Sequence, residues 1–369
     1  MSTARINTAA LNMGGSGSEL DPLPGQLVLP GMPEAEAEPG IGQPALPGLG
    51  DLGDLSGPGA QGAAEEDPQL AAVAAELTAL DGDGARMADA IRGALDMLLD
   101  GQHTGRYRWE QLHKTEKTHA GTLVEIALAR ALRLADGTAL DYTIAGADVD
   151  CKFSHRMGGW MIPPEADGQL MLLVQASDED GTWSAGLLRV TADNLRPAGN
   201  RDLKHALNDR GRAEVRWLHH RAPLQENALI KMPERDVTAV FALPSGQQRV
   251  NELFRRAQRI RVSRTVIATV AMQDDYMKRV RDGGGARERL RGEGIVIFGD
   301  YAGDQLLAGA LGLPRPGPGE FVSARLARRA GEPDGAAAGR YARCVRLDGA
   351  DWRLAAPGDP VMAAPALPR

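Results

Sequence analysis

The feature that most restricts the fold is a change of apolar period between residues 122 and 153. From Thr122 to Leu134 the apolar residues recur at helical spacing, which predicts a helix. From residue 141 to residue 153 the period becomes two, which predicts a tight β-hairpin turning at Ala145-Gly146. The expected apolar face of the helix consists of Leu123, Ile126, Ala127, Ala131 and Leu134.

Other elements are expected on both sides of this helix and hairpin. Helices are predicted at 70–80 and 85–99, followed by a loop from 100 to 109. Strands are predicted at 169–176 and 183–190, with polar helices through roughly 198–216. Helix, hairpin and two further strands predict an α+β or α/β core of about one domain's size.

The character of the chain changes near residue 223. Three short helices are predicted at 249–259, 264–271 and 274–281, followed by the glycine run Gly283–Gly285 and a strand at 295–298. Short arginine-rich helices closed by a hairpin are typical of a winged helix-turn-helix, so a second, mainly helical DNA-binding domain is expected. Residues 317–368 carry only weak strand signals and many turns.

The net charge of −7 is unevenly distributed. Residues 1–67 hold one cation, Arg5, against ten acids, together with 13 Gly, 8 Pro and no aromatic residue. Such a segment cannot bury enough apolar surface to order itself, so it is predicted to be disordered. The expected organisation is a tail at 1–67, a first domain at 68–222 and a second domain at 223–369.

A basic segment lies within the second domain. Residues 249–291 hold twelve Arg or Lys and five Asp or Glu, a local net charge of +7. A solvated helical face is the ordinary explanation for such a run, but the imbalance favours contact with phosphate. The predicted DNA-binding residues here are Arg249, Arg255, Arg256, Arg259, Lys278, Arg279 and Arg281.

Several classes of protein are disfavoured. The chain has no apolar run of 18 residues, so a membrane span is not expected. Met1 to Ala10 lacks the basic-then-apolar order of a signal peptide. Cys151 and Cys344 are in no zinc-ligand spacing and do not indicate a disulfide framework. A cytoplasmic location is therefore expected.

The hairpin carries the residues on which catalysis could depend. Asp150 and Lys152 are two apart in a strand and therefore share a face. If Ile144 pairs with Ala147, Asp141 lies across from Asp150 with a Cβ separation of roughly 5 Å. Two facing carboxylates need a proton, the neighbouring lysine or a divalent metal to neutralise them.

Mg²⁺ would suit this pair because proteins commonly hold it by one or two carboxylates. Lys152 would then orient the attacking water and stabilise charge on a phosphate. Glu125, expected in the first turn of the preceding helix, could complete the metal shell. The alternative is that an isolated D-x-K and a lone helix glutamate belong to a solvated surface.

Three neighbouring residues also have ordinary structural explanations. Cys151 points away from the carboxylates and is expected to be a small core residue. Lys114 and Lys117 could grip phosphates flanking the scissile bond, although exposed lysines near a helix start are ordinary.

Specific motifs connect these residues to a known family. The run HKTEKTHAGTLVE from His113 to Glu125, with Asp141 and the strand DCKFS at 150–154, resembles the NaeI-type (type IIE) restriction endonucleases of the PD-(D/E)xK superfamily. Further matching segments are NRDLK at 200–204, LQEN at 224–227, RVNELFRR at 249–256, MKRVR at 277–281 and PGDP at 357–360. The resemblance covers about 68–369. It departs from the superfamily pattern at Leu140, where a proline is common.

The resemblance implies a restriction-endonuclease-like core in which Glu125, Asp141, Asp150 and Lys152 are catalytic and the first three bind metal. It implies Mg²⁺-dependent cleavage of both strands of DNA at a palindromic GC-rich site such as GCCGGC. Cutting both strands of a palindrome calls for a two-fold homodimer. The second domain would bind another copy of the site and act as an effector site, giving two copies of double-stranded DNA per dimer.

Two other functions remain open from the sequence. One is a nicking repair endonuclease of the MutH type, which would use the same carboxylates. The other is a winged-helix DNA-binding regulator whose nuclease domain is inert. An inert domain would be free to lose Asp150 or Lys152, whereas this chain retains the whole set.

Overall fold

The computed structural model describes residues 67–197, 203–329 and 343–368. The predicted tail lies outside this range except for Asp67, as do residues 198–202 of the expected polar helices. Within the described residues no helix is both long and apolar enough to cross a membrane.

A six-stranded mixed sheet organises residues 67–223. Its strand order is β1-β2-β3-β4-β5-β6, with β3 and β4 parallel and every other neighbouring pair antiparallel. The strands are β1 (Ala135–Asp136), β2 (Tyr142–Ile144), β3 (Ala147–Ser154), β4 (Leu170–Ser177), β5 (Thr182–Arg189) and β6 (Arg216–Pro223). Every residue of β4 is buried, as expected for a central strand covered on both faces.

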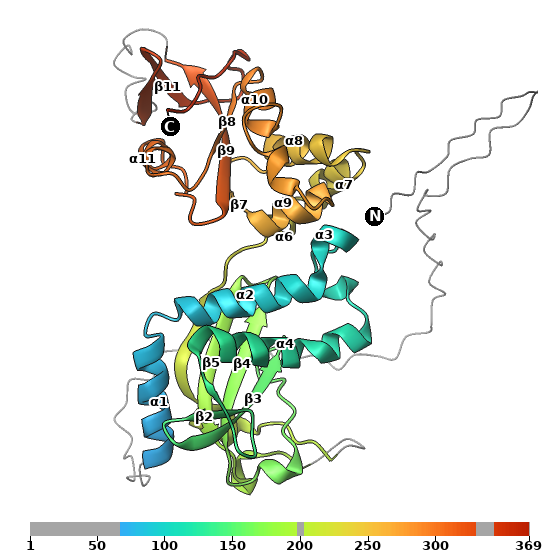
Figure 1. The fold of residues 1–369 in the computed structure, drawn as a ribbon, viewed down its shortest axis with the longest axis vertical. Helices are drawn as coiled ribbons and strands as arrows, with labels where there is room; N and C mark the ends of the chain where they lie inside the picture. The colour runs from blue at the N-terminus through green and yellow to red at the C-terminus, as the bar shows by residue number, and fades with distance from the viewer. Residues whose placement is uncertain (1–66, 198–202, 330–342, 369) are drawn as a thin grey trace, which may run out of the picture. The chain divides into compact units, whose positions relative to one another are not determined.

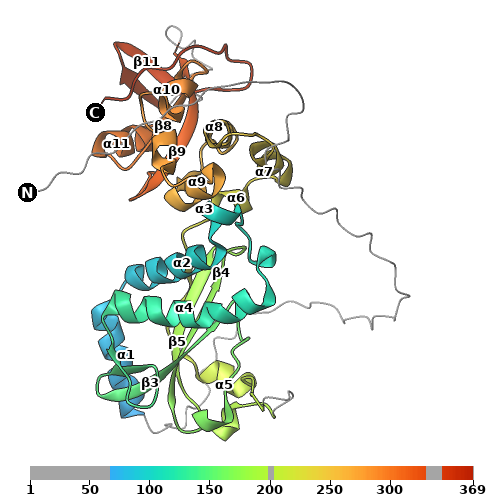
Figure 2. The ribbon, with the colours of Figure 1, turned by 45° about the vertical axis from the view of Figure 1, so that its right-hand side comes forward.

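Helices cover one face of this sheet. They are α1 (Pro68–Leu80), α2 (Ala85–Leu99) and α4 (Lys114–Leu132), and α4 packs on both α2 and β3 (Figures 1 and 2). Their apolar side chains join those of Val149, Cys151 and Leu172 in one core. A separate cluster around Trp160, Met171 and Leu188 fills the opposite face of the sheet. The short helices α3 (Gly101–Thr104), η1 (Trp109–Gln111), η2 (Pro164–Ala166), η3 (Ala192–Asn194) and α5 (Asp209–Glu214) lie in the connections.

The predicted hairpin is confirmed with its register. Ile144 pairs with Ala147 and Tyr142 with Val149. Ala145 and Gly146 both have positive φ, at 50° and 76°. This is the type I′ geometry that matches the twist of two antiparallel strands. The predicted helices at 70–80 and 85–99 and strands at 169–176 and 183–190 are confirmed to within a few residues.

Other sequence predictions are corrected. The helix expected from residue 122 begins at Lys114, because Glu116 accepts the backbone N–H of His113 and caps it. Its buried stripe consists of Ala120, Val124, Leu128 and Leu132, whereas Ile126 is exposed. Leu123, Ala127 and Leu134 of the expected face are partly buried and pack against the core, so the predicted face borders the buried stripe without coinciding with it. The polar helices expected through 216 reduce to α5, and strand β6 was not predicted.

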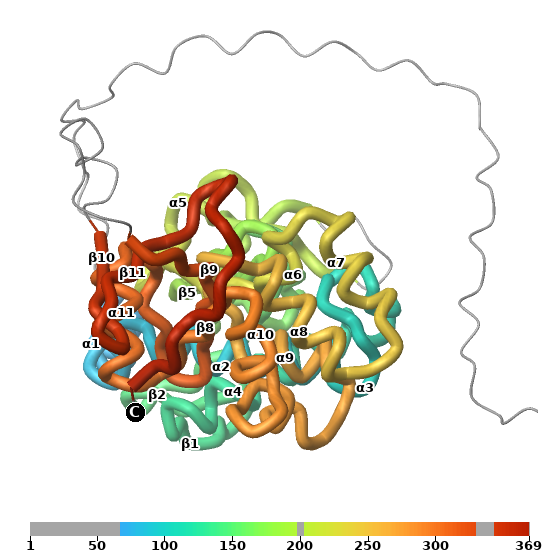
Figure 3. Tube along the Cα trace, turned by 90° about the horizontal axis from the view of Figure 1, so that it is seen from above, coloured from blue at the N-terminus to red at the C-terminus, as the bar shows by residue number. Residues whose placement is uncertain are grey.

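A second sheet lies in residues 224–368. Its central strand, β9 (Glu320–Arg328), pairs antiparallel with β7 (Arg261–Ser263), β8 (Ile295–Phe298) and β11 (Ala350–Leu354), and β11 pairs with β10 (Cys344–Leu347). The helices are α6 (Ala228–Lys231), α7 (Glu234–Phe241), α8 (Gly246–Arg256), α9 (Arg264–Ala271), η4 (Tyr276–Arg279), α10 (Ala286–Arg291) and α11 (Ala302–Ala310). Seen from above, α7 and the pair β10–β11 lie on opposite sides of this group (Figure 3).

The predictions for this region are partly confirmed. The helix at 264–271 and the strand at 295–298 are present, and the helix expected at 249–259 spans 246–256. The third expected helix is only the short 3₁₀ turn η4, and α7 and α10 were missed. β8 and β9 pair as expected of a hairpin, but residues 299–319, including α11, separate them.

Asp67 is the N-cap residue of helix α1. Its carboxylate accepts the backbone N–H groups of Gln69 and Leu70, capping α1, and contacts Arg189 of β5 at 2.8 Å. The Arg189 hydrogen bond is the main cause that holds the pKa of Asp67 below its usual range. The side chain therefore joins a helix terminus to the sheet.

We predict that Asp67→Ala lowers the free energy of unfolding by about 1–2 kcal/mol in urea titrations, because a cap and an ion pair are lost. Asp67→Asn, which retains a capping oxygen, should lose less. Since the folded-state pKa of Asp67 is depressed, its contribution is present above about pH 4 and is lost as the pH falls below that value. Equal stabilities of Asp67→Ala and the unaltered chain at pH 7 would contradict the assignment.

Candidate active site

The hairpin brings the two predicted aspartates together. Asp141 directly precedes β2, whose first residue, Tyr142, pairs with Val149 of β3. Oδ2 of Asp141 accepts the backbone N–H of Cys151 at 2.7 Å, which fixes the carboxylate against β3. Asp150 and Lys152 share one face, while Val149 and Cys151 are buried on the other. The strand geometry expected from the sequence is confirmed here.

Lys152 and Asp150 form a close ion pair. The distances from Lys152 Nζ to the Asp150 carboxylate oxygens are 2.6 Å (Oδ1) and 2.5 Å (Oδ2), and Nζ also donates to the carbonyl of Cys151 at 3.2 Å. Both side chains are largely shielded from solvent. Oδ2 is buried, and among the described residues it has the ion-pair contact but no well-formed hydrogen bond.

Glu125 of helix α4 is close enough to Asp141, Asp150 and Lys152 for their charges to affect its pKa. Burial raises the pKa of its carboxyl, and the negative charges of Asp141 and Asp150 raise it further, while Lys152 opposes them. The hydroxyl of Tyr142 donates to the carbonyl of Glu125 at 2.8 Å, which ties α4 to β2. Glu125 lies well inside the helix and not in its first turn, because α4 begins at Lys114.

Asp150 also carries a raised pKa. Burial is the main cause, Lys152 lowers the value, and Asp141 raises it. Three carboxylates and one lysine leave an excess of negative charge that a cation can neutralise. In the part of the chain that the structure describes, however, no three Asp, Glu, His or Cys side chains are gathered tightly enough to hold a metal by themselves. The facing aspartates, with the poorly satisfied Oδ2 of Asp150, fit a cation that takes its remaining ligands from water and substrate.

Cys151 and Asp148 are neighbours with structural roles. Burial raises the pKa of the Cys151 thiol to about 12, so it is no nucleophile at neutral pH. Asp148 accepts the backbone N–H groups of Thr138 and Ala139 and shapes the loop that leads to Asp141.

Comparison with known proteins agrees with this arrangement. Residues 71–363 match the family described as restriction endonuclease NaeI. The chain belongs to the NaeI restriction endonuclease family. It is 48% identical over 314 residues to the type II restriction enzyme NaeI of Lentzea aerocolonigenes, an alignment that covers 83% of this chain and 96% of that protein. The family resemblance and the enzyme class expected from the sequence, a type II site-specific deoxyribonuclease that acts on double-stranded DNA, are thereby confirmed.

Two of the predicted DNA-binding lysines lie at the start of α4. Lys114 is exposed and Lys117 half-buried, in the helix's first turn. Neither side chain has a hydrogen bond or ion pair to another described residue. The positive end of the helix dipole adds to their charge, so this terminus suits an anion such as a phosphate.

In this NaeI-family chain, the basic segment at 249–291 has fewer arginines free to bind phosphate than its net charge indicates. Arg255 forms a two-pronged ion pair with Glu293, both contacts at 2.8 Å, and also bonds Glu252. Arg256 contacts Glu252 at 2.6 Å and Asp236 at 2.5 Å. Asp236 and Glu293 lie outside residues 249–291, so a count over that window misses the acids that neutralise it.

Three other predicted DNA-binding arginines form hydrogen bonds that stabilise the fold. The guanidinium of Arg249 donates to the carbonyls of Val270 and Ala271 and caps the end of α9. Arg259 donates to the carbonyl of Ala355, and Arg279 to the side chain of Gln273.

Lys278 and Arg281 differ from the rest of the predicted set. Both are exposed, and neither side chain has a hydrogen bond or ion pair within the described ranges. They are the members best placed to meet phosphate.

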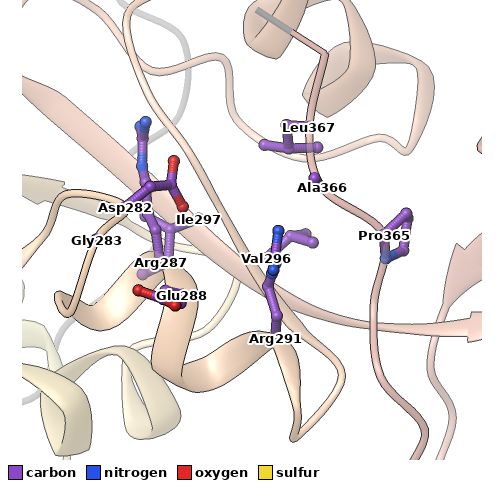
Figure 4. A pocket seen from close by; sticks show the side chains of 10 residues that line it. All are labelled: Asp282, Gly283, Arg287, Glu288, Arg291, Val296, Ile297, Pro365, Ala366 and Leu367. Carbon is purple, nitrogen blue, oxygen red and sulfur yellow. The ribbon is translucent and has the colours of Figure 1, made fainter.

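A cavity of about 330 Å³ lies beside α10 and residues 365–367 (Figure 4). Arg287, one of its lining residues, is buried and faces the rings of Tyr301 and Phe321 at 5.6 and 5.7 Å. Its Nη2 is 3.7 Å from Asp304 Oδ2. This arginine therefore supports the fold, and the cavity contains none of the four predicted catalytic residues.

We predict that Arg255→Ala and Arg281→Ala separate stability from DNA binding. Arg255→Ala should lower the free energy of unfolding by up to about 1 kcal/mol and leave the salt dependence of DNA binding unchanged. Arg281→Ala should leave stability within about 0.5 kcal/mol and reduce the slope of log affinity against log salt by roughly one. Urea unfolding and DNA titrations at several salt concentrations measure both, and the reverse pattern would contradict the assignment.

Proposed function

We propose that this chain is a Mg²⁺-dependent restriction endonuclease that hydrolyses both strands of DNA at a palindromic GC-rich site, GCCGGC. The observation that carries the proposal is the hairpin, which holds the Asp141 carboxylate against the backbone of β3 beside Asp150 and sets Lys152 against Asp150. Membership of a restriction endonuclease family favours double-strand cleavage over the nicking alternative. The presence of all four predicted catalytic residues argues against an inert nuclease domain.

In this proposal Asp141 and Asp150 would hold the cation, and Glu125 of α4 would contribute a third carboxylate. A divalent cation bound there supplies Lewis-acid stabilisation of the charge that builds on the scissile phosphate. Lys152 stays near this centre, orients the attacking water through its ammonium group, and stabilises negative charge on the phosphate oxygens. Val149 and Cys151 of the same strand are buried on its other face, which keeps the Asp150 and Lys152 side chains together on one face.

The second domain is proposed to be a winged helix that binds a further copy of the site. The order α8, β7, α9, α10, β8, β9, with β7 and β8 both paired to β9, supports this topology. The buried apolar residues form clusters within residues 67–224 and within residues 228–367, with Tyr107 of the first range packed against the second, and this grouping supports domains at 68–222 and 223–369. A two-fold homodimer would place one active site on each strand of a palindrome.

We predict that Asp150→Asn and Lys152→Ala each reduce cleavage of a plasmid carrying GCCGGC by about 10²- to 10³-fold, a loss typical of removing a key electrostatic group. DNA binding should remain measurable because it draws mainly on basic side chains. Chelation of Mg²⁺ should stop cleavage by the unaltered chain. Glu76→Gln, an exposed carboxylate change on α1, is the matched control and should cut normally. Full cleavage by Asp150→Asn at saturating Mg²⁺ would refute the assignment.

The effector role predicts that a plasmid with one site is cut slowly and that an added cognate duplex accelerates it. Binding at one site can promote cleavage at another only if the two sites are energetically coupled. A scrambled duplex of equal length is the control, and Lys278→Ala with Arg281→Ala should weaken the stimulation. Equal acceleration by cognate and scrambled duplexes would leave only a nonspecific contribution to affinity.

A further inference from the structure

Besides the cavity beside α10, the structure has a pocket with a polar lining at the carboxyl ends of strands β3 and β4, within the proposed nuclease domain. It encloses about 290 Å³, and its lining includes Trp109, His155, Arg156, Gln175, Asp180 and Arg221. Gln175 is the register partner of Ser154, and Leu173 is that of Lys152. Because side chains alternate along a strand, Gln175 and Ser154 share the face that carries Asp150 and Lys152.

The pocket lies close to the proposed cutting centre. His155 follows Lys152 by three residues, which is roughly 10 Å along an extended chain. Successive nucleotides of B-DNA are about 3.4 Å apart along the helix axis. A duplex whose scissile phosphate met Lys152 would therefore bring bases within about three pairs of the cut to this pocket.

An aromatic pair forms one wall. The rings of Trp109 and His155 are stacked, with centroids 4.4 Å apart and planes 10° from parallel. Gln175 Nε2 donates to the carbonyl of His155 at 3.3 Å and holds that backbone in place. Nε2 of His155 is buried and has no hydrogen-bond partner among the described residues. Burial lowers the pKa of this histidine from its usual range, which favours the neutral ring at pH 7.

Two arginines that border the pocket form no ion pair with a carboxylate of the described residues. The side chains of Arg156 and Arg221 make no hydrogen bond or ion pair to any described residue, in contrast to Arg255 and Arg256. Arg221 has φ +51°, a strained backbone conformation for a residue other than glycine. Its N–H donates to Ser184 Oγ at 2.9 Å, which fixes the strained position.

Carboxylates line the same pocket. Glu110 and Asp180 are both exposed, and the Asp180 backbone is anchored by Ser177 Oγ at 3.2 Å. A phosphate would be attracted by the arginines but repelled by these acids. A G·C pair presents guanine N7 and O6 as acceptors and the cytosine amino group as a donor, so it matches both kinds of side chain. Adenine is best read by an accessible Asn or Gln amide, whereas Gln175 is only 4% exposed and gives one of its two amide hydrogens to the His155 carbonyl.

We propose that this pocket reads a G·C pair of the cut site in the major groove, with Arg156 donating to guanine and Asp180 accepting from the cytosine amino group. The inference rests on the proposed function, since it presumes a duplex cut at Asp150 and Lys152. The strand that carries the chemistry would then lead directly into the residues that recognise sequence.

The test starts with the unaltered chain, whose cut sequence is read from the ends of digested DNA. Cleavage rates are then measured on the cognate duplex and on duplexes carrying each single base-pair change. Arg156→Ala should slow cognate cleavage about ten-fold or more and lose its preference at one base pair and that pair's symmetry mate. Arg156→Lys, which keeps the charge but lacks the planar fork, should lose the same preference. Arg346→Ala, which removes an exposed arginine from β10, is the matched control and should leave all ratios unchanged.

Two outcomes would overturn the pocket while leaving the proposed function standing. One is a uniform slowing of all duplexes by Arg156→Ala together with full activity of Arg156→Lys, which marks a phosphate contact. The other is unchanged discrimination in Arg156→Ala and Asp180→Asn. A thermal melt of each variant checks that the fold is intact. If the unaltered chain cut no DNA, the proposed function would fail with the pocket, and that result is visible before any variant is made.

Discussion

The antiparallel pairing of β2 with β3 is the constraint on which the candidate active site depends. Side chains alternate with a period of two, so a slip of one residue would turn Asp150 and Lys152 toward the core and Cys151 toward solvent. The type I′ turn at Ala145-Gly146 sets the register at one end. The hydrogen bond from the Cys151 N–H to the Asp141 carboxylate stabilises this register at the other end of the hairpin. Burial of Val149 and Cys151 under α2 and α4 then makes a slipped arrangement unfavourable.

Much of this site could be predicted from sequence because it is local. Asp141, Asp150 and Lys152 lie in one hairpin, and alternation together with a two-residue turn determines which side chains face one another. Glu125 was placed on the correct helix but in the wrong turn, since the polar start of α4 shows no apolar period. The buried stripe through Val124 and Leu128 depends on where the sheet lies, which a helix surrounded by apolar residues does not reveal.

The basic segment shows the opposite case. Its net charge suggests a surface open to phosphate, yet folding brings Asp236 and Glu293 to Arg256 and Arg255. Such partners are distant in sequence, and a local charge count cannot find them. The pocket around His155 was missed for the same reason, because its walls come from η1, the end of β3, the β4–β5 turn and β6. The only local signal was the pair His155-Arg156 directly after the strand.

The β3–β4 connection has a consequence for how such enzymes could diverge. These two parallel strands are joined by residues 155–169, which hold no element longer than the short 3₁₀ turn η2. Trp160, Ile162 and Ala166 of this connection are buried in the core, whereas Arg156 and Met157 are exposed and tolerate substitution more readily than a strand buried on both faces. Changes there would alter the rim of the pocket while the hairpin register upstream stayed fixed. Target preference could thus drift among descendants of one ancestor without loss of the hydrolytic chemistry.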